Sequence, residues 1–224
     1  MTATAPADAR HPGHDPHVLG RHGGGHPPPA PGSDGGPASK RIIVGYGFWL
    51  FLLSDIIMFS AIFAAYAVLQ GATAGGPDGR RLFSLSNAAI ETGCLLLSSF
   101  TCGLASIAAT AKNQLWTQIA LLVTGLLGFA FLSLELHEFA DMVAKGAGPQ
   151  RSAFLSAFFA LVGCHGLHVS VGLLWLGTMM AQFYAKGFRA DILRRMLCFS
   201  LFWHALDIIW VAILTIVYLM GAGR

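Results

Sequence analysis

The chain has 224 residues, of which 11% are charged and 54% are hydrophobic, and its formal net charge is +3. An ordinary globular domain has about 25% charged residues, so these few ionic groups cannot cover a surface that faces water. The net charge is too small to indicate nucleic-acid binding. The four cysteines form no C-x-x-C pair, which argues against a disulfide-stapled secreted domain and against the usual zinc sites. The composition therefore predicts an integral membrane protein.

Residues 1–40 differ in composition from the rest of the chain. They hold eight of the ten prolines, eight glycines and five of the nine histidines, and they show no apolar periodicity. Such a segment buries too little surface to offset the entropy cost of ordering, so we predict a disordered tail. The histidines are also able to bind a metal ion, but we assign the tail no function. They are His11, His14, His17, His22 and His26.

Residues 41–224 are predicted to form one all-α domain, a bundle of five transmembrane helices. A helix that spans a membrane needs about 20 mostly apolar residues. Five segments meet this requirement, at 42–69, 83–111, 114–141, 152–185 and 196–221; the third is free of charge to residue 134 and ends in the acidic stretch 135–141. Beyond the tail, the only prolines are Pro77 and Pro149, which lie in Gly-rich connections between these segments. We therefore expect no proline kink in any helix.

The distribution of lysine and arginine predicts the orientation of the bundle. With a cytoplasmic N-terminus, nine basic residues lie inside and five lie outside. The five outer ones are Arg80, Arg81, Lys145, Arg151 and Arg224. Because loops rich in Lys and Arg stay in the cytoplasm, we expect a cytoplasmic N-terminus and a periplasmic C-terminus.

Ionisable side chains inside the apolar segments are the candidate site, because they are costly to place in lipid. His165/His168, His204/Asp207 and Glu135/Glu138 are pairs spaced i, i+3, so the members of each pair share one helix face. The predicted buried polar network comprises Asp55, Glu91, His165, His168, His204 and Asp207. A predicted acidic cluster at the outer end of the third segment comprises Glu135, Glu138 and Asp141.

Three interpretations of these polar residues stay open on spacing alone. Histidine and carboxylate groups suit zinc, iron or copper, so a metal site is one of them. Hydrogen bonding between helices is the second, since lipid provides no hydrophobic drive for helix association. A proton relay through buried acids and imidazoles is the third. Glu91 has no partner apparent in the sequence, so we expect a neutral, hydrogen-bonding carboxyl group there.

Four segments resemble subunit III of the haem-copper oxidases. They read GFWLFLLSD at 47–55, ETGCLLLSS at 91–99, GCHGLHV at 163–169 and FWHALDIIW at 202–210, with Tyr218 following. The similarity runs in order from about residue 42 to 221. Five spans rather than seven, and the segments 73–77, 148–152 and 217–221, are similar to the branch found in cytochrome bo-type ubiquinol oxidases.

The resemblance implies a membrane subunit without a catalytic centre or metal ligand of its own. It would belong to a proton-pumping terminal quinol oxidase of the bacterial inner membrane, which reduces oxygen to water. Haem and copper are then expected on subunit I, ubiquinol is the substrate of the complex, and the partners are subunits I, II and a small subunit IV. Subunit III of a cytochrome c oxidase, an independent proton channel or transporter, and a metal-bearing enzyme are the alternatives.

The resemblance also implies roles for the buried polar residues. Asp55 and Glu91 would be structural anchors beside a cleft that holds phospholipid, and would support sustained proton uptake by subunit I. His165, His168, His204 and Asp207 would then serve packing between helices instead of binding a metal.

Overall fold

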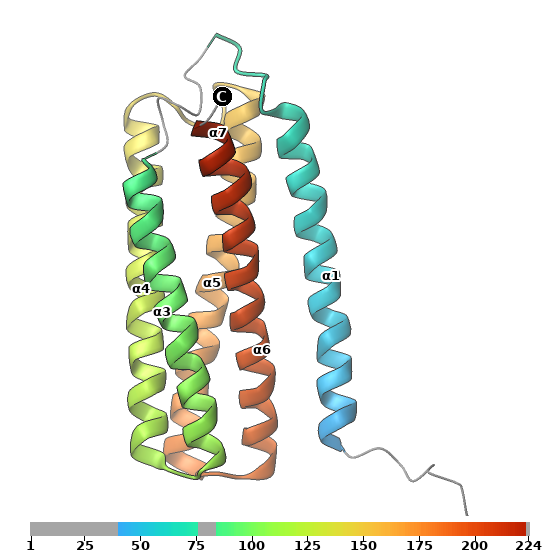
Figure 1. Cartoon of the computed structure of the whole chain (residues 1–224), viewed down its shortest axis with the longest axis vertical. Helices are drawn as coiled ribbons and strands as arrows, with labels where there is room; N and C mark the ends of the chain where they lie inside the picture. Colours follow the sequence, from blue (N-terminus) through green and yellow to red (C-terminus); the bar gives the residue numbers. More distant parts are fainter. Residues whose placement is uncertain (1–39, 76–83, 223–224) are drawn as a thin grey trace, which may run out of the picture. The chain divides into compact units, whose positions relative to one another are not determined.

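The computed structural model describes residues 40–75 and 84–222, and these are helical apart from turns and short connections (Figure 1). The chain divides into two units, Met1–Ala38 and Ser39–Arg224, and the described residues belong to the second unit. The predicted tail therefore lies outside the described residues, except that Lys40 opens the first helix.

Five helices are long and apolar enough to cross a membrane, which confirms the all-α prediction with five spans. Within the described ranges no strand is present. The helices are α1 (Lys40–Leu69), α3 (Leu85–Thr110), α4 (Gln114–Ala144), α5 (Ala153–Lys186) and α6 (Ala190–Ile213). The last span continues from α6 through the π-helical segment η1 (Leu214–Leu219) and the short α7 (Met220–Ala222).

Two helices extend beyond their predicted bounds. The third span was expected to end in the acidic stretch 135–141, and α4 continues a little farther, to Ala144. Glu135 in this stretch is turned into the protein and not into water. The fifth span was expected to begin at residue 196, but α6 begins at Ala190. Its charged first turns remain helical because a helix can project beyond the apolar layer, where charged side chains meet water.

Short, well-capped connections place successive helices side by side. The Asn113 side chain accepts a hydrogen bond from the Trp116 backbone N–H at 3.3 Å, and the Ser152 hydroxyl accepts one from Leu155 N–H at 3.2 Å. Gly187 ends α5 with φ of 64°, a left-handed conformation that glycine adopts without a steric penalty. The three-residue connections 111–113 and 187–189 make α3/α4 and α5/α6 antiparallel neighbours.

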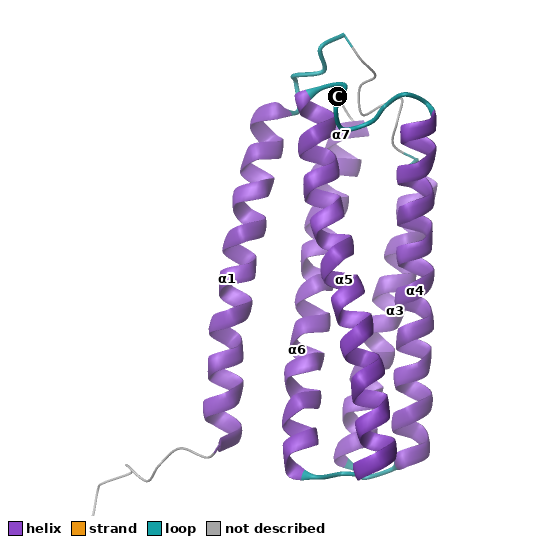
Figure 2. Ribbon diagram, turned by 180° about the vertical axis from the view of Figure 1, so that it is seen from behind, coloured by secondary structure: helices purple, strands orange, loops and turns teal. Residues whose placement is uncertain are grey.

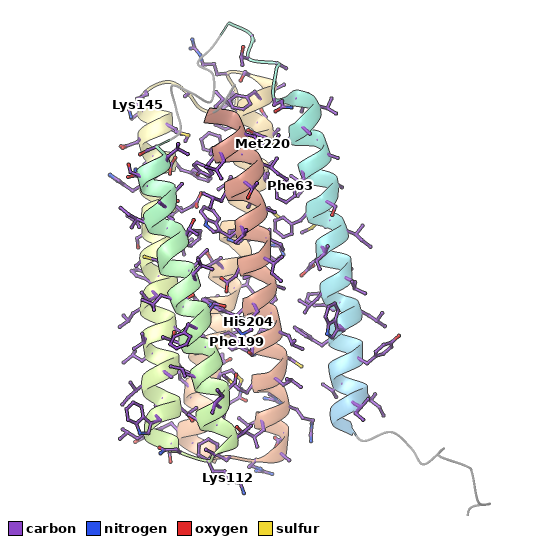
Figure 3. All side chains as sticks on the ribbon, viewed as in Figure 1. Phe63, Lys112, Lys145, Phe199, His204 and Met220 are labelled. Atoms are coloured by element: carbon purple, nitrogen blue, oxygen red, sulfur yellow. The ribbon has the colours of Figure 1, made fainter. Side chains whose placement is uncertain are left out.

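Within Ser39–Arg224, the helices α3, α4, α5 and α6 pack together, and α1 stands alongside α5 and α6 (Figures 1 and 2). The connections 111–113 and 187–189 lie at one end of the bundle, which we call the turn end, together with the start of α1 (Figure 2). Lys112 lies at the turn end, and Lys145 lies at the opposite end, near Met220 (Figure 3).

Trp203 of α6 is the centre of the packing among three helices. It is 1% exposed, and two glycines face its indole ring. A Cβ atom added at Gly128 of α4 or at Gly172 of α5 would lie 2.9 Å from carbon atoms of that ring. Glycine at these positions therefore lets α4 and α5 approach α6 closely, as small residues do in membrane helix packing.

Candidate functional site

The polar residues predicted as one network occupy four different surroundings. The first is a buried glutamate cluster, which we define as Glu91 of α3 with Glu135 and Glu138 of α4. Glu91 is fully buried and Glu135 is 2% exposed. The three carboxyl groups are close enough to interact electrostatically, and within the described ranges their oxygen atoms have no hydrogen-bond partner. The partner that the sequence did not reveal for Glu91 is thus a pair of acids on the neighbouring helix.

The predicted outer-end acidic cluster divides between interior and surface. Glu135 and Glu138 turn toward Glu91, whereas Asp141 is exposed and its carboxylate lies 3.9 Å from His137 Nε2. A cavity of about 340 Å³ lies between the interior glutamates and the exposed Asp141, and it is lined by Glu91, Glu138 and Asp141 among others. The buried Tyr218 hydroxyl from η1 is near the same glutamates. This short π-helical segment is of a type often found at functional positions.

The position of Glu91 relative to α4 could have been found by counting residues. Glu91 precedes the 111–113 connection by about 20 residues, and Glu135 follows it by about the same number. In an antiparallel pair joined by a tight turn, equal counts place two side chains at one level, because each residue rises about 1.5 Å. Glu91 and Glu135 therefore meet by topology, provided that their faces also match.

The second of these surroundings is the interface between α6 and α3. The Nδ1 atom of His204 and the Ser99 hydroxyl lie 2.6 Å apart and share a hydrogen bond. Asp207 lies near the same Ser99 and is 7% exposed, but its oxygen atoms have no partner with hydrogen-bond geometry within the described ranges. Sequence reasoning did not single out Ser99, because a serine within an apolar helix gives no distinctive signal.

Two tryptophans extend this connection along the same pair of helices. The Trp203 indole N–H donates to the Ser98 hydroxyl at 3.0 Å, and the Trp210 indole N–H donates to the Thr92 hydroxyl at 3.0 Å. Together with the bond between His204 and Ser99, these form what we call the α3–α6 hydrogen-bond ladder. Its three contacts use side chains spaced along about two turns of each helix. The two tryptophans thus supply directed hydrogen bonds in addition to packing.

His165 occupies the third surrounding, an aromatic pocket. The imidazole is fully buried, its ring centroid is 5.3 Å from that of Trp210 and 5.8 Å from that of Phe131, and neither ring nitrogen has a hydrogen-bond partner in the described ranges. A neutral imidazole between aromatic rings serves packing, since no carboxylate is paired with it.

Asp55 and His168 occupy the fourth surrounding, a small cavity of about 10 Å³ among α1, α5 and α6. The Nδ1 atom of His168 lies 2.7 Å from the backbone carbonyl oxygen of Cys164, one turn earlier on α5. Its ring also meets Phe59 of α1 edge-on, with centroids 5.2 Å apart. Asp55 is half-buried beside it. Asp55 and His168 therefore lie where α1, the least buried of the five spans, meets the other helices.

The set of three histidines and one aspartate that suggested a metal is thus spread over separate surroundings. Over residues 40–75 and 84–222, no group of three or more His, Cys, Asp or Glu side chains is arranged to hold a metal ion. The four cysteines are present as free thiols. What the described geometry does provide is directed contact between helices and one shared, buried cluster of acids.

These features define a class: an all-helical membrane protein of five spans whose buried polar groups lie chiefly where helices meet. The sequence profile described as "Cytochrome c oxidase subunit III" matches residues 38–222. The chain therefore belongs to the family of haem-copper oxidase subunit III, which confirms the resemblance seen in its motifs.

Similar proteins carry related names. The "Cytochrome bo(3) ubiquinol oxidase subunit 3" of Pseudomonas aeruginosa is 52% identical over 179 residues, which cover 79% of this chain and 85% of that protein. The "Quinol oxidase subunit 3" of Bacillus subtilis is 41% identical, with coverage of 79% and 87%. The "Cytochrome c oxidase subunit 3" of Bacillus sp. (strain PS3) is 42% identical, with coverage of 78% and 84%.

Proposed function

We propose that this chain is the non-redox subunit III of a terminal quinol oxidase complex that reduces oxygen and pumps protons. The observation that carries the proposal is the 52% identity over 179 residues to a protein named as a ubiquinol oxidase subunit. The contacts described above are consistent with it, because the buried polar side chains of α3 and α6 are directed at each other.

The proposal extends to partners and cofactors of the complex. Subunit I would hold the haems and copper, with subunit II and a small subunit IV completing the assembly, and ubiquinol would be the substrate. The bacterial inner membrane would be the location, with the turn end in the cytoplasm. The bias of basic residues supports this orientation, since Lys112, Lys186 and Arg189 all lie at or beside the two turn-end connections.

We further propose that Asp55 and Glu91 are structural polar anchors, with a phospholipid beside Asp55, and that they support proton uptake by subunit I. The position of Asp55 where α1 meets α5 and α6 supports the anchor role. The adjacent apolar groove between α1 and α6, of about 350 Å³ and lined by Leu52, Ile56 and Phe59 among others, supports a lipid chain beside it. Replacement of Asp55 by Asn should leave the initial rate of oxygen consumption near that of the wild type but shorten the number of turnovers before activity declines. The exposed Asp141→Asn variant is the matched control.

A cytochrome c oxidase subunit III is the second candidate, because a relative with that name is 42% identical. Purification of the complex through a tag on this chain separates the two candidates. A haem- and copper-containing complex that oxidises ubiquinol supports the proposal, and oxidation of reduced cytochrome c in its place supports the alternative. A chain that purifies alone with stoichiometric metal would overturn both.

A further inference from the structure

A second polar cavity lies at the turn end, away from the glutamate cluster. Its volume is about 360 Å³, and its walls come from the last turns of α3 and the first turns of α6. α3 contributes Ser106 and Thr110, and α6 contributes Ala190, Arg194 and Ser200. No residue of α1 lines it, so it is separate from the cavity at Asp55.

Arg194 provides the charge of this cavity. Its side chain is half-buried, and within the described part of the chain no carboxylate lies within 4 Å of it. Its two neighbouring arginines are different. Arg189 lies 3.7 Å from the Asp191 carboxylate, and Arg195 donates a hydrogen bond to Gln182 Oε1 at 2.9 Å. Among the residues that line the cavity, Arg194 is the one with a formal charge.

Further groups on the same walls favour an anion. Ser106, Thr110 and Ser200 line the cavity, and each carries a hydroxyl group that can rotate to suit a partner. The Thr110 hydroxyl donates to the Ile107 carbonyl oxygen at 2.7 Å. The Ser106 hydroxyl is only loosely held by its own helix, at 3.2 Å from the Cys102 carbonyl oxygen. The N-cap of α6 provides no side-chain hydrogen bond, and Ala190, the first residue of that helix, faces the cavity. The first N–H groups of a helix have no partner within the helix and its dipole is positive at this end, and Asp191 in the first turn of α6 offsets part of that charge.

The remaining wall is apolar. It is made by Leu193, Met196 and Leu197 of α6 and Ala109 of α3. A free phosphate ion gains nothing from such a wall, whereas a molecule with an anionic head and hydrocarbon chains gains from both parts. Basic pockets between membrane helices on the cytoplasmic side are suited to anionic lipid head groups. The turn end also carries Lys112, Lys186, Arg189 and Arg195 in or beside its two connections.

We propose that this cavity binds the phosphate group of an anionic phospholipid, with Arg194 as its counter-ion and the Leu193/Leu197 wall against the start of an acyl chain. The inference rests on the proposed membrane orientation and is independent of the electron donor. It places a lipid at the α3/α6 face, apart from the phospholipid proposed beside Asp55.

The test compares the intact oxidase complex, purified in mild detergent, as wild type, Arg194→Gln and Arg195→Gln. Arg195 is the matched control, because it has the same charge and lies next in sequence but does not line the cavity. Native mass spectrometry and quantification of extracted phosphatidylglycerol should show about one fewer anionic phospholipid per complex in Arg194→Gln only. Equal lipid content in all three would overturn the proposal.

A second measurement distinguishes a lipid from a free ion and from a partner subunit. After detergent delipidation, dioleoylphosphatidylglycerol should raise the melting temperature of the wild-type complex but not that of Arg194→Gln. Dioleoylphosphatidylcholine and inorganic phosphate should have little effect. An equal effect of inorganic phosphate would overturn the lipid assignment, as would loss of a neighbouring subunit from Arg194→Gln with lipid content unchanged. If either of these results is found but the wild-type complex oxidises ubiquinol, the lipid assignment fails and the proposed function stands. The proposed function itself fails if the chain co-purifies with no oxidase subunits.

Discussion

α1 and the α6 span are alike as sequences but are buried to very different extents. The most apolar 18-residue window has a mean hydropathy of 2.1 in the α1 span, Ile42–Leu69, and of 2.0 in the span Ala190–Leu219. Yet 11% of the most apolar window is buried in α1, against 50% in the α6 span. The hydropathy that takes a helix into a membrane does not decide how deeply it packs, because lipid chains are as apolar as leucine.

The difference follows from polar and small residues. In α6 the side chains of Trp203, His204 and Trp210 form hydrogen bonds with hydroxyl groups of α3. Glycines of α4 and α5 leave room for the Trp203 ring. In α1 the hydroxyls of Ser54 and Ser60 donate to carbonyls of α1 itself. α1 contacts α5 through rings, as between Phe48 and Trp175 with centroids 5.8 Å apart. Directed contacts and close backbone approach therefore separate an interior helix from a peripheral one.

The largest expected effect tests the glycine contacts of Trp203. Replacing Gly172 by Ala places a Cβ atom 2.9 Å from the Trp203 ring and 3.2 Å from Phe202. Overpacking of this kind costs about 1–3 kcal/mol, although alanine favours the helix by about 1 kcal/mol over glycine. We expect a lower melting temperature of the purified complex. Gly177→Ala on the same helix meets nothing within 4 Å and should not lower it.

A double-mutant cycle measures one contact of the α3–α6 hydrogen-bond ladder. Trp203→Phe and Ser98→Ala each remove one partner of the bond between the indole N–H and the hydroxyl. Interhelical hydrogen bonds of this type contribute about 0.6 kcal/mol on average and up to about 1.7 kcal/mol. Unfolding in a denaturing detergent should give a coupling energy within this range. Fully additive effects would mean that the two side chains do not stabilise each other.

A smaller effect on the whole complex is expected from α1. Phe48→Ala removes the ring contact with Trp175, so α1 should move away from α5 more readily while α3 to α6 stay packed. Hydrogen exchange should therefore rise in α1 with little change in α6. Ile57→Ala, at a position that is 70% exposed, is the control and should leave both helices unchanged. A parallel rise in α1 and α6 would show that the two helices unfold as one unit.

The smallest effect is expected at the glutamate cluster. Glu91→Gln keeps the shape and hydrogen-bonding capacity of the side chain and reduces the number of carboxyl groups that share the buried space with Glu135 and Glu138. Assembly and initial turnover should match the wild type, as measured by subunit content and oxygen consumption. The shorter, apolar Glu91→Ala variant leaves a cavity and should be less stable. Complete loss of oxygen reduction in an assembled Glu91→Gln complex would contradict a supporting role.

Sequence alone predicted the five spans, because an apolar run of fixed length and the Gly- and Pro-rich connections report on local structure. It placed the start of the last span six residues too late, at 196, whereas α6 begins at Ala190. It placed the end of the third span in the acidic stretch 135–141, close to the end of α4 at Ala144, but it did not show that Glu135 is buried. It also identified the ionisable residues that the interior must accommodate, and the spacing that puts His204 and Asp207 on one face of α6.

Only the tertiary structure decided which residues those faces meet. The i, i+3 pattern of His204 and Asp207 does not reveal that Ser99 of α3 is the partner of His204. Counting residues from the 111–113 turn places Glu91 and Glu135 at one level, but only the structure shows that their helix faces meet. Nor does hydropathy distinguish α1 from α6. The physical reason is that periodicity records how a residue is oriented about its own helix axis, whereas a contact also depends on which helix lies opposite and how closely the two backbones approach.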